Sequence, residues 1–441
     1  MMSSQLSSRG RRFAALTATL ATLLGAAACG VGGDAGSSGG GTGSDVTLTF
    51  QWWGNDDRAK ATQQVVDLYE SKNPGVKIET SYAPDANYWE KMATQVAGGN
   101  TPDIFQMKLE YFKEYQARGV IADLTPYTTG SDAALHTASM PKQYLAAGQI
   151  GDKTYGLPTG QATQALFYDP KAWTALGLTK PAPGWTWDDL KADGAKVKAA
   201  TKGTKAVMAD FGDEAPWFEA WLLQHGKSLY TDDGKLNFTE TDLRDFWTFT
   251  SGLAAEGVLT PAKVTTANDR TVANSPLVKR AALAEINDVS LASSYFDGFG
   301  DVALAPLPSA PDAKTSGSFA GVTQLLTVSN KSTHQKEAVK FIDFFLNDPQ
   351  AGKILGLTRG MPANQTVLTA LSPTFKAGDK ATYDFEQAMA DKIVSRPPVA
   401  PEGGSQSLTD FKNEYDKVIF GKESVADAAK AMFAKFQSNI S

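Results

Sequence analysis

The chain has 441 residues, a formal net charge of −6 and a single cysteine, Cys29. One cysteine excludes disulfides within the chain, and the acidic balance excludes the basic footprint of a nucleic acid-binding protein. Single hydrophobic cores stop growing near about 250–300 residues, so the length predicts at least two lobes.

The first 28 residues have the pattern of a bacterial export signal. An apolar stretch over 13–28 ends in Ala26-Ala27-Ala28, the small residues that a signal peptidase requires before Cys29. This stretch of about 16 residues is too short to span a bilayer as a helix, which takes roughly 20. We predict a signal peptide over 1–28. Its positive segment contains three arginines, Arg9, Arg11 and Arg12.

The segment before Cys29 resembles the lipobox of bacterial lipoproteins, with Ala26 where that family usually has Leu. A buried or catalytic cysteine is the alternative, but neither suits a position between an apolar run and a flexible tract. Residues 30–45 are almost wholly Gly, Ser, Ala and Thr, which bury too little apolar surface to fold. We therefore predict a lipidated Cys29 and a flexible linker over 29–44, anchoring the chain to the extracytoplasmic face of the membrane. Arg11-Arg12-Phe13 leaves both the Sec and the twin-arginine export routes open.

From residue 46 the pattern alternates between strands and helices. Apolar and polar residues alternate over 46–51, which predicts a strand that ends at Trp52-Trp53-Gly54. Strand, helix, strand, helix, strand is typical of a parallel sheet. The later segments of this unit are a helix through 61–69, a strand over 76–82, a helix through 88–96 and a strand over 102–107.

The rest of the chain looks more helical. Thr186 precedes acidic residues and predicts a helix N-terminus, and Leu325-Leu326-Thr327-Val328 predicts a strand followed by a helix over about 334–346. Three prolines interrupt the last helical third: Pro397, Pro398 and Pro401.

Seven motifs occur in order along the chain. Together they resemble the family 1 extracellular solute-binding proteins, the maltose-binding-protein-like receptors of ABC sugar importers, over about 46–365. The resemblance implies an α/β, two-lobed periplasmic-binding-protein-like (type II) fold with a hinge and an interlobe cleft. The motifs are Trp52-Trp53-Gly54, Lys72-Asn73-Pro74-Gly75-Val76, Gly98-Gly99-Asn100-Thr101-Pro102-Asp103-Ile104, Tyr155-Gly156-Leu157-Pro158, Phe167-Tyr168-Asp169-Pro170, Trp185-Thr186-Trp187-Asp188-Asp189-Leu190 and Phe341-Ile342-Asp343-Phe344-Phe345-Leu346-Asn347-Asp348-Pro349.

The resemblance also implies a domain organisation and a function. Lobe 1 would comprise 45–160 and 314–370, lobe 2 would comprise 161–313 and 371–441, and the hinge would lie near 159–163. The protein would be a monomer that captures a sugar or oligosaccharide in the cleft and delivers it to the membrane permease subunits of an ABC importer.

A pyranose has apolar faces and a rim of hydroxyls, so a sugar site stacks aromatic rings on the faces and places planar polar groups at the edges. Because neighbouring strand residues point to opposite faces, at most one of Trp52 and Trp53 faces a ligand, and the family pattern favours Trp53. The candidate ligand-binding residues are Trp53, Asn55, Asp56, Arg58, Glu110, Tyr111, Gln161, Gln164, Glu214, Trp217, Trp221, Asn287, Asp288, Gly321 and Arg359.

Most candidates have a structural alternative, and for Trp53, as for Trp52, it is ordinary core packing. Glu110 and Tyr111 follow the third strand, where the family places an acidic contact, but Lys108 departs from the acid expected nearby, and a solvated helix start is the alternative. Gln161 and Gln164 precede a buried strand and are otherwise an ordinary polar loop.

The candidates in the second lobe and near residue 359 also have more than one interpretation. Trp217 and Trp221 lie four apart on one helical face beside Glu214, and core packing is the alternative. Asn287-Asp288 ends an apolar run and is otherwise a simple turn. Gly321 lies among small residues that let the backbone approach a ring. Arg359 is a hydroxyl donor, a carboxylate clamp for an acidic sugar, or a surface arginine.

Two other functions compete with the sugar receptor. A secreted glycoside hydrolase needs only two carboxylates across a scissile bond, and a receptor for a polyamine or an amino-acid derivative could use the same fold. The sequence has no Gly-x-Ser-x-Gly or His-Glu-x-x-His motif, and its three histidines are scattered. We therefore expect no enzymatic activity, no cofactor and no metal. The histidines are His136, His225 and His334.

Overall fold

The structure is a computed structural model that describes residues 46–54, 56–129, 133–401, 403–404 and 406–440. The predicted signal peptide, the lipidated Cys29, the linker and the candidate Asn55 lie outside the described residues. Within the described part of the chain, no helix has both the length and the apolar character needed to cross a bilayer.

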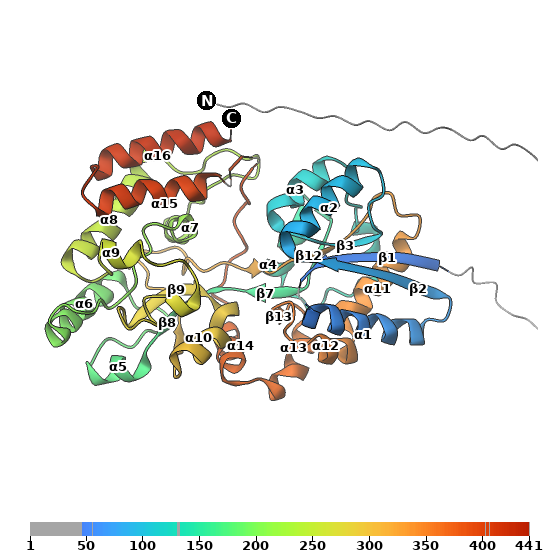
Figure 1. The fold of residues 1–441 in the computed structure, drawn as a ribbon, viewed down its shortest axis with the longest axis horizontal. Helices are drawn as coiled ribbons and strands as arrows, with labels where there is room; N and C mark the ends of the chain where they lie inside the picture. The colour runs from blue at the N-terminus through green and yellow to red at the C-terminus, as the bar shows by residue number, and fades with distance from the viewer. Residues whose placement is uncertain (1–45, 55, 130–132, 402, 405, 441) are drawn as a thin grey trace, which may run out of the picture. The chain divides into compact units, whose positions relative to one another are not determined.

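The first lobe is built on a five-stranded sheet in the order β2-β1-β3-β12-β6 (Figure 1). β1 pairs in parallel with β2 and β3, which confirms the predicted parallel unit. β12 runs antiparallel to β3 and β6, so the sheet as a whole is mixed. The strands are β1 (Val46–Trp53), β2 (Val76–Ala83), β3 (Ile104–Met107), β6 (Leu157–Pro158) and β12 (Leu325–Val328).

Alternation along β1 decides which helices cover this sheet. Leu48, Phe50 and Trp52 are buried, and the Phe50 ring lies 5.6 Å from that of Phe341 on α11. The first lobe therefore has an aromatic core beneath β1. Its helices are α1 (Asp56–Lys72), α2 (Asp85–Ala97), α3 (Leu109–Ala117), α4 (Lys142–Leu145), α11 (Gln335–Asn347), α12 (Pro349–Leu355) and α13 (Gln365–Leu371), with a hairpin of β4 (Gln149–Ile150) and β5 (Lys153–Thr154).

The second lobe has an antiparallel sheet in the order β10-β8-β9 and more helices. Thr186 caps α6 in a capping box with Asp189, as its sequence predicts. Phe218, Trp247 and Phe411 pack together in the core of this lobe. The strands are β8 (Gln164–Tyr168), β9 (Ala284–Asp288) and β10 (Ala303–Ala305), and the helices are α5 (Pro170–Ala175), α6 (Trp187–Thr201), α7 (Ala215–Gln224), α8 (Glu240–Glu256), α9 (Ala262–Thr265), α10 (Ala292–Phe299), α14 (Ala377–Met389), α15 (Gln406–Ile419) and α16 (Val425–Asn439).

Short 3-10 helices complete the chain, and the predicted proline break is confirmed between α14 and α15. The 3-10 helices are η1 (Thr125–Tyr127), η2 (Ala146–Gly148), η3 (Val272–Asn274), η4 (Val289–Leu291) and η5 (Ser372–Thr374).

Three strands connect the two lobes in a small sheet of their own, with the order β11-β7-β13. β7 (Gly160–Ala162) leads from β6 to β8, β11 (Gly321–Val322) leads from β10 back to β12, and β13 (Met361–Pro362) precedes the segment that reaches α14. β7 pairs antiparallel with both neighbours. We call these three strands the crossing sheet. It includes the residues where the sequence predicted a hinge.

The crossing sheet depends on close backbone approach. A Cβ atom on Gly160 would collide with the carbonyl oxygen of Arg359, and one on Gly321 would lie 2.7 Å from the carbonyl oxygen of Ala162. Both contacts are with backbone, which cannot move aside as a flexible side chain would. Glycine is therefore required at both positions.

We predict that Gly160→Ala lowers the free energy of unfolding by about 1–3 kcal/mol, because the added methyl group forces the crossing strands apart. Gly252→Ala is the matched control: nothing lies within 4 Å of a Cβ there, and the residue is inside α8, so alanine adds about 0.5–1 kcal/mol of stability. Urea denaturation of the two variants measures both effects. Equal stability of Gly160→Ala and the unaltered protein would contradict the close approach.

Candidate functional site

A groove of about 460 Å³ lies between α3 of the first lobe and α7, α15 and α16 of the second. This volume falls in the range of small-molecule sites, roughly 300–1,000 Å³. We call it the α3–α7 groove. Its walls combine aromatic rings, prolines and carboxylates with one guanidinium. The lining side chains include Glu110, Tyr111, Glu114, Glu219, Tyr230, Phe319 and Arg396.

The first wall of the groove is α3, which begins directly after β3. Leu109 and Phe112 are buried and hold the helix against the first lobe, so the intervening Glu110 and Tyr111 face outward. The Tyr111 ring is 38% exposed and lies 4.4 Å from the ring of Trp89. Both candidates therefore line the groove, with an aromatic ring available for stacking.

Trp53 is linked to this wall through other aromatic rings. It is the last residue of β1 and half-buried, and its ring lies 5.8 Å from Trp89 and 5.5 Å from Tyr88. The Lys108 ammonium lies 5.7 Å from the Trp53 ring centre. Trp53 does not line the groove itself, so it supports Tyr111 through Trp89. Trp52, on the other face of the strand, is core.

The second wall contributes a buried acid that is not among the residues predicted from the sequence. Glu219 on α7 is 6% exposed, and its Oε1 accepts a hydrogen bond of 3.0 Å from the Leu229 amide. Burial raises the pKa of Glu219 to about 7, although the amide and Arg396 oppose the shift. Its position in the otherwise apolar run Ala215–Leu223 is the signal that could have identified it.

Arg396 interacts electrostatically with carboxylates of both lobes. It lies in the segment between α14 and α15, with its guanidinium 5.7 Å from the Phe319 ring centre. Burial lowers its pKa, while the carboxylates of Glu110, Asp288 and Glu219 raise it. Arg396 thus interacts with an acid from α3 and with acids from α7 and β9. The prolines that follow it were predicted only to break a helix.

Two candidates lie where β8 and β9 approach this arginine. Asp288 ends β9 and is exposed, yet the surrounding chain raises its pKa through desolvation, opposed by Arg396 and by a hydrogen bond with Gln164. Gln164 is buried, and its Oε1 accepts a hydrogen bond from the Phe319 amide. Gln164 therefore holds in place the segment that carries Phe319.

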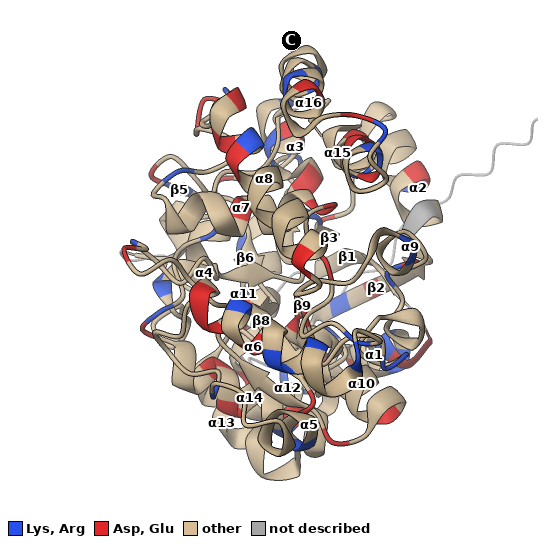
Figure 2. Cartoon of the chain, turned by 90° about the vertical axis from the view of Figure 1, so that its left-hand side faces the viewer, with Lys and Arg blue, Asp and Glu red and all other residues tan. Residues whose placement is uncertain are grey.

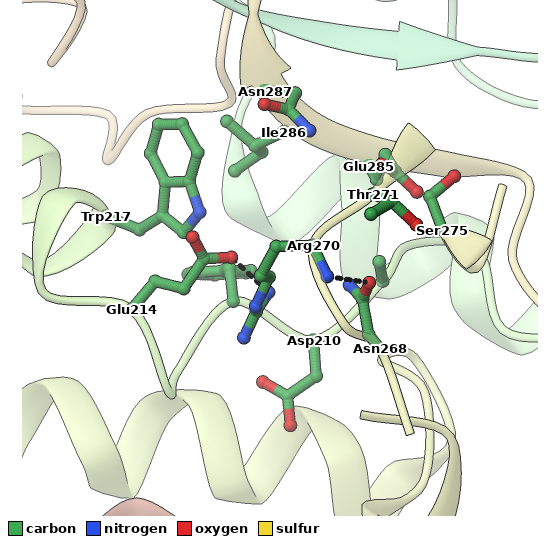
Figure 3. A pocket seen from close by; sticks show the side chains of 12 residues that line it. Asp210, Glu214, Trp217, Asn268, Arg270, Thr271, Ser275, Glu285, Ile286 and Asn287 are labelled. Atoms are coloured by element: carbon green, nitrogen blue, oxygen red, sulfur yellow. Dashed lines mark hydrogen bonds and ion pairs between the residues drawn. The ribbon is translucent and has the colours of Figure 1, made fainter. Parts of the chain in front are cut away.

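A second, smaller cavity of about 70 Å³ lies at the N-terminus of α7 and the end of β9. We call it the α7 cavity. Pro216 lines the groove and the next residue, Trp217, lines the cavity, so α7 contributes to both spaces. Figure 3 shows the Arg270 side chain beside Glu214, with Trp217 and Asn287 around them. Three candidates line this cavity: Glu214, Trp217 and Asn287.

Charge in the α7 cavity is concentrated around Arg270, which forms ion pairs with Asp213 and Glu214. Burial raises the pKa of Glu214 to about 7, and Arg270 opposes this. Burial also raises the pKa of Asp210 to about 7; its carboxylate accepts hydrogen bonds from the Tyr415 hydroxyl. One guanidinium thus interacts with several carboxylates, as Arg396 does in the groove. Asn287 donates a hydrogen bond of 3.0 Å to the Tyr295 hydroxyl.

Two candidates have a structural role where ligand contact was expected. Arg359 is 5% exposed inside the first lobe and donates to Gln106 and Thr62, so it is neither a surface arginine nor a clamp in the groove. Trp221 packs with Phe218, Phe246 and His225 and lines neither space. Their spacing of four residues predicts that Trp217 and Trp221 lie on one face of the helix. Because apolar residues pack against α7 on several sides, a shared face does not bring both rings to the same cavity.

The remaining candidates also belong to the framework. Gln161 is buried in β7 and accepts a hydrogen bond from Gln365. Gly321 allows the close backbone approach within the crossing sheet. Asp56 is exposed at the start of α1 and accepts from the Tyr82 hydroxyl. Arg58 donates to the backbone oxygens of Trp53 and Thr358, which ties α1 to the strand end.

The described residues include no cluster of three or more His, Asp or Glu that could hold a metal ion. Figure 2 shows acidic and basic residues interspersed over the helices on the face drawn.

Two α/β lobes joined by crossing strands, with a groove lined from both, define a periplasmic-binding-protein-like fold. The chain belongs to the family of bacterial extracellular solute-binding proteins, whose family model matches residues 52–352. The structure is similar to a family 1 extracellular solute-binding protein from Alicyclobacillus acidocaldarius, with 29% identity, a TM-score of 0.80, and coverage of 91% of this chain and 100% of that one.

Two sequence relatives carry informative names. A galactooligosaccharide-binding protein from Bacillus subtilis is 22% identical over 376 residues, 83% of this chain and 84% of the relative. An uncharacterized lipoprotein from Streptomyces antibioticus is 25% identical over 311 residues, 68% of this chain and 67% of the relative.

We predict that Glu219 makes the free energy of unfolding fall as pH rises. Its pKa of about 7 in the native state exceeds the value of roughly 4.3 in an unfolded chain, so the native state binds the proton more tightly. This contribution is fully present below about pH 4.3 and is lost as pH rises to about 7, on the order of 1–3 kcal/mol.

Glu219→Gln should remove this part of the pH dependence and raise stability at pH 8 relative to pH 5. Urea denaturation at both pH values measures the difference. Glu114→Gln, which alters an exposed carboxylate of the same groove, is the control and should keep the original dependence. The assignment fails if Glu219→Gln and Glu114→Gln behave alike.

Proposed function

We propose that this protein is the extracytoplasmic receptor of an ABC importer and binds a saccharide in the α3–α7 groove, with the α7 cavity as a second subsite. The observation that carries the proposal is the convergence of aromatic rings and carboxylates from both lobes on one groove. Tyr111 supplies an exposed ring for a sugar face, Tyr230 and Phe319 line the groove as buried rings, and Glu110 and Glu219 supply acceptors for hydroxyls. The name of the galactooligosaccharide-binding relative supports this ligand class.

The charges of the groove restrict the saccharide. Three carboxylates, those of Glu110, Glu114 and Glu219, line it with one guanidinium, that of Arg396. The α7 cavity repeats the excess of acid around Arg270. A uronic acid would add like charge beside these carboxylates, which is unfavourable. The preferred ligand is therefore a neutral saccharide, and the expectation of an acidic sugar held by Arg359 is dropped.

Binding between two lobes explains how the receptor signals occupancy. A ligand that contacts both walls binds the closed form more tightly than the open one and shifts the population toward closure. In this proposal lobe 1 comprises 45–160 and 314–370, and lobe 2 comprises 161–313 and 371–441, with the crossing sheet as the hinge. The closed receptor, a monomer, would then dock on the permease subunits.

Membrane attachment through a lipid on Cys29 would keep the receptor near its permease. The relative named as a lipoprotein supports this attachment. Release of a Cys29→Ala variant into the medium is the expected result, and retention of that variant at the membrane would count against lipidation.

Capture without turnover is favoured over glycoside hydrolysis because the family and its named relatives are binding proteins. A receptor for an amino-acid derivative or a polyamine is a further alternative on the same fold. The acidic walls and the aromatic rings would also suit a polyamine, whereas the galactooligosaccharide-binding relative favours a saccharide.

A thermal-shift screen of neutral, amino and uronic oligosaccharides, followed by calorimetry and an assay for hydrolysis, tests the proposal. A ligand at 100 times its Kd adds about 2.7 kcal/mol of stability, which such a screen detects. We expect binding of a neutral oligosaccharide, weaker binding of its uronic counterpart and no products. No binding by any saccharide, or turnover of one, would refute the function.

For the saccharide so found, we predict that Tyr111→Ala raises the Kd at least about tenfold, or about 1.4 kcal/mol, through the lost stacking surface. Tyr82→Ala is the matched control, because Tyr82 is also an exposed tyrosine of the first lobe but does not line the groove. Calorimetry should give the control the affinity of the unaltered protein. Equal losses for the two variants would place the ligand elsewhere.

A further inference from the structure

A cluster of aromatic rings lies behind Tyr111, the exposed ring of the α3–α7 groove. Trp89 on α2 is at its centre and is not among the residues predicted from the sequence. Its ring packs against four others, which come from β1, α2 and α3. Their centroids lie 4.4 Å (Tyr111), 5.1 Å (Tyr88), 5.8 Å (Trp53) and 6.0 Å (Tyr115) from that of Trp89.

The rings on the inner side of Trp89 are held in place by the first lobe. Tyr88 and Tyr115 are buried, and the Tyr88 hydroxyl donates a hydrogen bond of 2.6 Å to the backbone oxygen of Gln106 on β3. The indole Nε1 of Trp89 is buried and has no hydrogen-bond partner among the described residues. Packing against these fixed rings therefore determines where the Trp89 indole lies.

Tyr111 depends on Trp89 more than on any other ring of the cluster. It lies on the outward face of α3, and its second ring contact, with Tyr115, is longer at 6.5 Å. A ring that is held before the ligand arrives loses less conformational freedom on binding, which increases affinity. Trp89 does not line the groove, so any effect on a ligand passes through Tyr111.

We propose that Trp89 is a positioning residue of the saccharide site and holds the Tyr111 ring in the orientation that stacks on a pyranose face. This role rests on the proposed function, because it requires that Tyr111 contacts the saccharide. A residue of α2 outside the groove thus sets part of the affinity, and it does so only through Tyr111.

A double-mutant cycle tests this role by calorimetry with the neutral oligosaccharide selected by the thermal-shift screen, galactotriose being the first tested. Trp89→Ala should raise the Kd about three- to tenfold, and Trp89→Phe, which keeps a ring against Tyr111, should recover most of the lost affinity. The double variant Trp89→Ala/Tyr111→Ala should bind no more weakly than Tyr111→Ala alone. Additive losses in the double variant would overturn the proposal, because they would show that Trp89 acts independently of Tyr111. If Trp89→Ala does not fold, Trp89→Leu replaces it, since leucine fills part of the space without a ring.

A second experiment needs no ligand. The protein is labelled with fluorotyrosine, and Tyr111→Phe assigns the Tyr111 fluorine resonance among those of the 13 tyrosines. Trp89→Leu should shift this resonance, because the ring current of the indole is lost, and should narrow it, because the ring moves more freely. The resonance of Tyr82, which stacks on Trp52, is the control and should not change.

The two experiments separate this role from the proposed function. An unchanged Tyr111 resonance in Trp89→Leu would overturn the role of Trp89 whether or not a saccharide binds. A shifted resonance together with no binding by any saccharide would instead support the hold of Trp89 on Tyr111 and refute the proposed function.

Discussion

The two lobes are held together by the hydrogen bonds of the crossing sheet. The chain leaves the first lobe through β7 and returns through β11, and both strands are hydrogen-bonded in one sheet with β13. Paired strands bend together but cannot separate without losing their hydrogen bonds. We propose that the two lobes rotate about this narrow connection, with α3 and α7 opposite each other across the groove.

The position of the two lobes brings carboxylates from both of them close to one arginine in the groove. Acids from α3, α7 and β9 act on one guanidinium, Arg396, whose segment belongs to neither sheet. Such a network spans both lobes without filling the space between them, so it leaves hydroxyl acceptors available to a ligand. A saccharide that bridges the walls would add contacts found only in the closed form, and only such differential contacts drive closure.

Local patterns predicted the framework well. Alternation in β1, the cap at Thr186 and the prolines after 396 depend on neighbours in sequence, and the structure confirms the elements that they predict. The antiparallel direction of β12 could not be predicted in this way, because strand direction depends on a connection that passes through the second lobe.

The candidate site was predictable only where local sequence patterns determine which residues meet. Glu110, Tyr111, Glu214 and Trp217 line the two spaces because strand ends and helix starts converge there. Arg359 and Trp221 have the right residue types but are buried by partners distant in sequence, such as Gln106 and Phe246. Arg396 was missed because an arginine beside prolines has no periodicity to indicate its neighbours.

Small-angle X-ray scattering with and without a saturating saccharide measures directly whether the two lobes close on a ligand. We expect a smaller radius of gyration in the complex, because the ligand draws α3 and α7 together about the crossing sheet. An unchanged radius of gyration, with binding demonstrated in the same sample by calorimetry, would contradict a groove that closes between two lobes.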